Sequence, residues 1–97
     1  MDFEKFKEDF ITEVSTLLVE KKVAINQYTG VEKDKAKLQH LENFDNFVNE
    51  INLRINEALT RNGADFKSQS EADAFGVMLN PLIQNIYKEY TDLASEQ

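Results

Sequence analysis

The 97-residue sequence contains no cysteine and no tryptophan, and it has only three glycines, one proline and one histidine. The absence of cysteine excludes disulfide bonds, thiolate nucleophiles, zinc ribbons and iron–sulfur clusters. The low glycine and proline content argues against a turn-rich β-sandwich. No stretch approaches the roughly 20 apolar residues that a membrane-spanning helix needs. The first residues also lack the basic and apolar regions of a secretory signal, so we expect a cytoplasmic protein, or one carried inside a virion, that does not enter a membrane.

What the sequence does contain is a large excess of acidic side chains. Aspartate and glutamate number 18 against 11 lysines and arginines, which gives a formal charge of −7. Such a charge repels phosphate, so we expect no direct binding to nucleic acid or to anionic lipid. Hydrophobic residues make up 41% of the chain, enough to build a core. A chain this short forms one core, and residues 1–97 are therefore expected to be a single domain.

Two long segments show the apolar periodicity of amphipathic helices, each with its apolar side chains within about 120° of a helical wheel. In the first, over residues 2–27, they are Phe3, Phe6, Phe10, Val14, Leu17, Leu18, Ile25 and Tyr28. In the second, over residues 31–61, they are Leu41, Phe44, Phe47, Val48, Ile51, Ile55, Ala58 and Leu59. Gly30 separates the two segments, and Gly63 supplies a stop after the second because glycine reaches left-handed conformations without steric cost.

A third amphipathic segment is expected over residues 70–94, beginning at Ser70, which has the spacing of a helix start signal with Asp73. Its apolar stripe consists of Ala72, Phe75, Leu79, Leu82, Ile86, Tyr90 and Leu93. The stripe continues through Pro81 without a change of register, which favours one helix kinked near this residue over two separate helices. Three such segments joined by short loops predict an all-α fold, an elongated antiparallel three-helix bundle.

Few residues are candidates for chemistry. His40 is the only histidine, and it lies at the edge of the second apolar face without an H-x-x-x-H or E-x-x-H motif. Asp9 and Glu13 lie outside the first stripe, where exposed carboxylates contribute little to general acid–base chemistry. We therefore expect a structural role for His40, no metal, no cofactor and no enzymatic activity.

Some apolar residues point away from the predicted core. Val19 and Val23 are one turn apart on the back of the first helix, Leu53 lies on the back of the second, and Val77 faces away from the third stripe. A monomeric bundle needs only one buried stripe per helix. These four residues are therefore candidate interface residues, although single exposed aliphatic side chains are also ordinary.

A second candidate site is basic. Five lysines are expected near the junction of the first two helices: Lys21, Lys22, Lys33, Lys35 and Lys37. Cations at a helix N-terminus are mildly disfavoured, so this patch is a candidate site for a small anion or an acidic partner. Glu32 and Asp34 dilute its charge.

These features favour a small acidic interaction protein. We expect a protein partner of unidentified nature, either a second copy of the chain or a larger protein that it inhibits or assists. The alternative is an acidic decoy that occupies the groove of a nucleic-acid-binding protein. Small acidic helical proteins among phage and bacterial accessory proteins share this size and class, but no motif links the chain to them.

Overall fold

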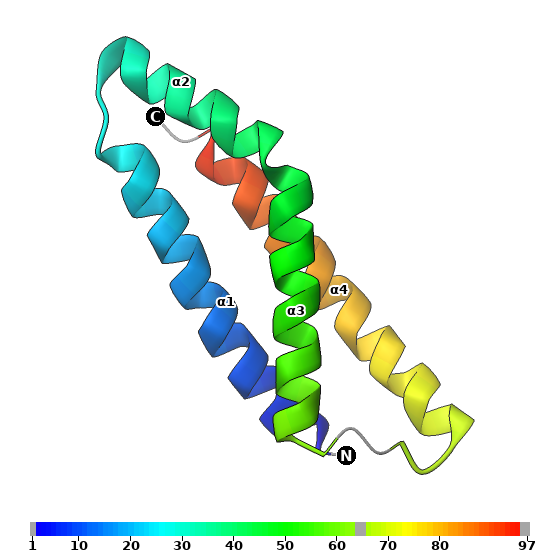
Figure 1. Ribbon diagram of the computed structural model, residues 1–97. Helices are drawn as coiled ribbons and strands as arrows, with labels where there is room; N and C mark the ends of the chain where they lie inside the picture. The colour runs from blue at the N-terminus through cyan, green and yellow to red at the C-terminus, as the bar shows by residue number, and fades with distance from the viewer. Residues whose placement is uncertain (1, 64–65, 96–97) are drawn as a thin grey trace.

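The computed structural model describes residues 2–63 and 66–95, and within these ranges every regular element is helical. Four helices follow one another: α1 (Phe3–Asn26), α2 (Gly30–Glu42), α3 (Phe44–Arg61) and α4 (Gln69–Leu93). Helices α1 and α4 run in one direction, α3 returns in the other, and α2 crosses one end (Figure 1). The molecule measures 53 × 19 × 18 Å, and its radius of gyration is 15.7 Å. A compact domain of this length would have a radius of gyration of about 12.5 Å.

Helix α1 forms where its apolar stripe predicts. The side chain of Asp2 caps its first turn by accepting a hydrogen bond from the backbone N–H of Lys5 at 3.2 Å. The stripe is buried at Phe6, Phe10, Val14, Leu17 and Ile25. Tyr28 lies beyond the helix and is exposed, so it does not extend the core.

The predicted three-helix bundle is wrong in one respect, because the expected helix over residues 31–61 is two helices. Helix α2 ends at Glu42 and α3 begins at Phe44, with Asn43 between them at φ −87° and ψ 11°. Leu41, expected in the core, is exposed on α2. The chain turns sharply at this junction (Figure 1).

The break at Asn43 has a tertiary cause. Backbone hydrogen bonds cross the junction from the N–H of Asn43 to the carbonyl of Gln39 and from the N–H of Phe47 to the carbonyl of Asn43. Between these bonds, the carbonyl of His40 accepts a hydrogen bond from the hydroxyl of Tyr90 at 2.5 Å. A side chain that enters the backbone ladder in this way bends or interrupts a helix.

Helix α4 is continuous through Pro81, so a split at this residue is excluded, while a kink there stays a prediction. The helix is capped by Ser68, whose side chain accepts from the N–H of Glu71 at 3.2 Å. The expected start at Ser70 is therefore slightly late. Two positions of the connecting loop, 64 and 65, lie outside the described residues.

The core is a single cluster along the rod, and α1 contacts all three other helices. At one end, the ring of Phe6 meets Phe75 edge-on, with centroids 4.9 Å apart. Towards the other end, Tyr90 stacks on Phe47 at 4.1 Å and on His40 at 3.7 Å. Aromatic rings thus join α4 to both α1 and α3.

Candidate functional site

The four candidate interface residues are all exposed, but they do not share one surface. Val19 and Val23 are 60% and 54% exposed and adjoin each other on α1. Leu53, 54% exposed, lies on the side of α3 away from its buried face. Val77, 76% exposed, lies on the corresponding outer side of α4. Only Val19 and Val23 therefore belong to a larger apolar surface.

Val19 lines a groove between α1 and α4, and Val23 adjoins Val19 one turn further along α1. The wider part of the groove, about 260 Å³, is lined by Leu18, Val19, Lys22, Glu89, Asp92 and Leu93. Its narrower part, about 100 Å³, is lined by Ile11, Val14, Ser15, Leu18, Leu82, Asn85, Ile86 and Glu89. The two parts share Leu18 and Glu89, so they adjoin each other, and together they are called the α1/α4 groove below.

The rim of the α1/α4 groove carries charges of both signs. Lys22 lines it from α1, whereas Glu89 and Asp92 line it from α4. On α4 the carboxylate of Asp92 pairs with Lys88 at 3.2 Å, and that of Glu89 accepts from the side-chain amide of Asn85 at 3.2 Å. The groove thus has an aliphatic floor and a polar, mixed-charge edge, as protein interfaces do.

The five lysines of the predicted basic patch have different surroundings. Lys21 forms an ion pair with Glu50 on α3 at 3.5 Å, and Lys35 pairs with Glu32 at 3.7 Å. Lys22 lines the α1/α4 groove. Lys33 and Lys37 are half-buried on α2.

His40 is buried and belongs to a reciprocal pair with Tyr90. Its Nε2–H donates to the carbonyl of Tyr90 at 2.7 Å, while the Tyr90 hydroxyl donates to the carbonyl of His40. Because Nε2 carries the proton of the neutral ring, further protonation takes place at Nδ1. Desolvation lowers the pKa of His40 most, the hydrogen bond to Tyr90 opposes this, and the positive charge of Lys21 lowers the pKa further.

A cleft of about 260 Å³ lies beside this pair. It is lined by Lys21, Ala24, Ile25, Tyr28, Ala36, Gln39, His40, Asn43 and Tyr90. Its lining has no carboxylate, serine or threonine, and its polar side chains are Lys21, Tyr28, Gln39, His40, Asn43 and Tyr90.

The lowered pKa of His40 predicts that stability falls with acidity. The unfolded chain takes up a proton near the ordinary pKa of 6.5, whereas the folded chain resists protonation until a lower pH. The contribution of His40 to the free energy of unfolding should therefore be fully present above about pH 6.5 and decrease below it. Urea denaturation between about pH 5 and 7.5 measures this slope. His40→Gln, whose amide can still donate to Tyr90, should flatten the slope, and an unchanged slope would contradict this assignment.

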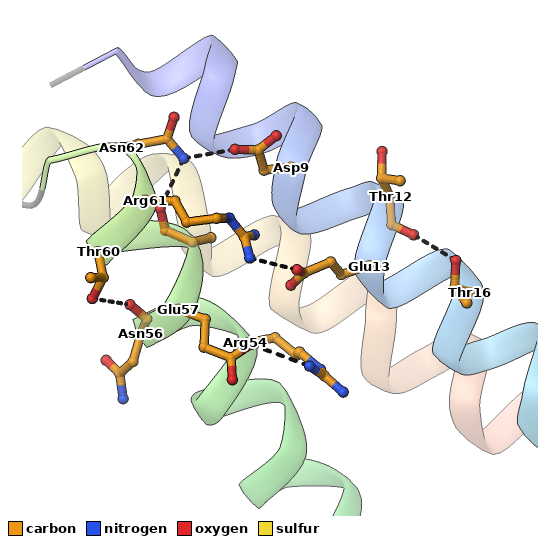
Figure 2. Close-up of polar contacts among 11 residues, drawn as sticks. Asp9, Thr12, Glu13, Thr16, Arg54, Asn56, Glu57, Thr60, Arg61 and Asn62 are labelled. Atoms are coloured by element: carbon orange, nitrogen blue, oxygen red, sulfur yellow. Dashed lines mark hydrogen bonds and ion pairs between the residues drawn. The ribbon is translucent and has the colours of Figure 1, made fainter.

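Carboxylates on the opposite flank of α1 tie it to α3 (Figure 2). Glu13 pairs with Arg61 at 2.7 Å, and Asp9 accepts from the side-chain amide of Asn62 at 2.9 Å. Asp9 and Glu13 are half-buried, so their expected full exposure is wrong. Their spacing of four residues beside the stripe, together with Arg61 and Asn62 at a helix end, is the sequence signal for this contact. Within residues 2–63 and 66–95, no group of three metal-ligating side chains is present.

Two apolar features were not predicted from the sequence. One is the set of residues that lines the groove, and the other is a row of exposed residues on α2. The periodicity predicts Leu82 and Leu93 for the core stripe and assigns Ile11 to no surface, whereas all three line the groove. On α2, Val31, Leu38 and Leu41 are exposed. Their spacings of seven and three residues place them on one helical face, which is the signal that sequence inspection offers.

Comparison with known protein families, curated proteins and solved structures finds no match to this chain. Among the helices described, none combines the length and apolar character needed to cross a membrane.

Proposed function

We propose that the protein is a small, acidic, non-enzymatic interaction module that binds a protein partner through the α1/α4 groove. The observation that carries the proposal is the continuity of the groove with the exposed pair Val19 and Val23. Together they form an aliphatic surface with a mixed-charge rim on two long helices. Contiguous apolar surface rimmed by polar groups is typical of protein interaction sites.

The rod shape supports this proposal. Accessible surface totals 6367 Å², whereas a compact monomer of this mass, 11.2 kDa, exposes about 5,700 Å². The chain therefore leaves roughly 700 Å² more surface in water than a compact fold would. Burial of part of this surface against a protein partner would stabilise both molecules.

Val19→Glu should abolish partner binding without unfolding the chain, because it places an unpaired charge in the aliphatic groove. The matched control is Val77→Glu, the same change at an exposed position outside the groove. Tagged wild-type and variant chains are used to capture proteins from cells that naturally produce this protein, and circular dichroism checks that each variant is folded. We expect wild type and Val77→Glu to retain the same protein, and Val19→Glu to lose it. Equal capture by both variants, or no capture by wild type, would reject the proposed function.

A further inference from the structure

The outer face of α1 has the spacing of a helix–helix seam. Residues separated alternately by four and three positions share one face of a helix and can meet a neighbouring helix. On this face they are Glu4, Glu8, Ile11, Ser15, Leu18 and Lys22. Four of them line the α1/α4 groove, and Glu4 and Glu8 are exposed. The seam is thus acidic at its start, aliphatic in the middle and basic at its end.

This seam is complementary to itself when reversed end for end about Ser15. The reversal places Glu8 opposite Lys22 of the other helix, so two opposite-charge pairs form. It also places Ile11 opposite Val19, a groove residue beside the seam. At the centre Ser15 meets Ser15, and two small side chains let the helices approach closely. Antiparallel packing also sets the positive end of each helix dipole beside the negative end of the other.

We propose that the groove is occupied by a second copy of the chain, packed antiparallel about a two-fold axis at Ser15. This inference rests on the proposed function and names its partner. A two-fold interface uses the same patch on both subunits, and reversal about Ser15 meets this requirement at three kinds of contact: Glu8 with Lys22, Ile11 with Val19, and Ser15 with Ser15.

The exposed row on α2 is a weaker place for a second copy. It lies on a helix of 13 residues, about 20 Å long. The seam on α1 lies on a helix of 24 residues, about 36 Å long, with α4 beside it. The α1/α4 face therefore offers the larger contact area.

Two charge reversals, Glu8→Lys and Lys22→Glu, test the register of the pairing. In the homodimer of Glu8→Lys, two ammonium groups face each other at both contacts between positions 8 and 22. In the homodimer of Lys22→Glu, two carboxylates face each other at both of these contacts. Each variant alone should dissociate at least about tenfold more readily than wild type in sedimentation analysis, because like charges then face each other. Mixed in equal amounts, the two variants should form a heterodimer of near wild-type affinity, because an ammonium group then faces a carboxylate at both pairs.

This rescue follows from the two-fold axis. In the mixed dimer, position 8 of the first variant faces position 22 of the second, and position 22 of the first faces position 8 of the second, so both pairs regain opposite charges. Failure of the mixture to associate more tightly than either variant alone would contradict the register. The double variant Glu8→Lys/Lys22→Glu should likewise form a homodimer of near wild-type affinity, because both pairs regain opposite charges with their signs exchanged. A double variant as weak as the single variants would overturn the proposed register.

A cysteine at the axis tests the geometry directly, because the natural chain has none. Under mild oxidation, Ser15→Cys should give a covalent dimer with high yield. Thr60→Cys, at an exposed position on α3, is the matched control and should remain mostly monomeric. Efficient cross-linking at Ser15 requires the two α-carbons to come within about 7 Å.

Failure of this inference differs from failure of the proposed function. If the purified wild-type chain stays monomeric at high micromolar concentration, the second copy is not the occupant. The capture experiment with Val19→Glu then still decides whether the groove binds another protein.

Discussion

Phe6→Ala is expected to lower the free energy of unfolding by about 3–5 kcal/mol. The Phe6 side chain is fully buried. Its ring stacks on Phe10, with centroids 5.7 Å apart, and meets Phe75 of α4 edge-on at 4.9 Å. Truncation removes these contacts and leaves a cavity between two helices. A domain of this size has a total stability of about 5–15 kcal/mol, so the loss is a large part of the whole.

Urea denaturation followed by circular dichroism measures this effect, with two companion variants. Phe3→Ala is the same change one turn earlier, at a half-buried ring whose centroid is 5.8 Å from that of Phe75. Its loss should be clearly smaller. Phe6→Leu keeps much of the buried volume and should cost about 1–1.5 kcal/mol, so the site stays measurable even if Phe6→Ala does not fold. Equal losses at Phe3 and Phe6 would contradict the burial seen here.

The parts of the fold that the sequence predicts are those with local causes. Helix α1 ends within one residue of its expected bounds, because its cap at Asp2 and its stripe depend on neighbours along the chain. The stop at Gly63 is similarly local, since this residue adopts φ +67°, a conformation that glycine adopts most readily. Helix α4 continues through Pro81 with its apolar register unchanged, and this register also depends on residues close together along the chain.

The break at Asn43 is not local, and this is why the sequence pattern missed it. Apolar periodicity continues from α2 into α3, so the pattern alone favours one long helix. The deciding contact comes from Tyr90, fifty residues away, whose hydroxyl binds the His40 carbonyl. No single-segment pattern contains that information.

At the candidate site, too, the features with local causes are predictable from the sequence, and those that depend on tertiary packing are not. The helical wheel places Val19 and Val23 away from the core of α1, and the structure finds both exposed. The groove beside them depends on how far α4 covers the edge of the α1 stripe. Leu18 and Leu82, which the wheel places in the core, therefore line the groove because of how the two helices pack together.

Tyr90→Phe is expected to cost about 1–3 kcal/mol, because it leaves the buried carbonyl of His40 without its hydroxyl partner. The phenyl ring is retained, and with it the stacking on Phe47 and His40. The loss therefore reports the hydrogen bond and not the packing. This bond fixes the junction of α2 and α3, so in the variant the amide protons of α2 should exchange with solvent faster. The amide protons around Phe6 should keep nearly their wild-type protection once the overall stability loss is subtracted.

Tyr87→Phe is the matched control, one turn earlier on α4. Its ring meets Phe44 and Phe47 with centroids 5.3 Å and 6.4 Å away, and it is half-buried. Removal of its hydroxyl leaves the bond between Tyr90 and His40 intact, so the α2 amides should keep their protection and the stability loss should be smaller. If Tyr90→Phe is as stable as wild type, or if both variants loosen α2 equally, the hydroxyl of Tyr90 does not hold the bend, and the break at Asn43 must arise within the α2–α3 segment itself.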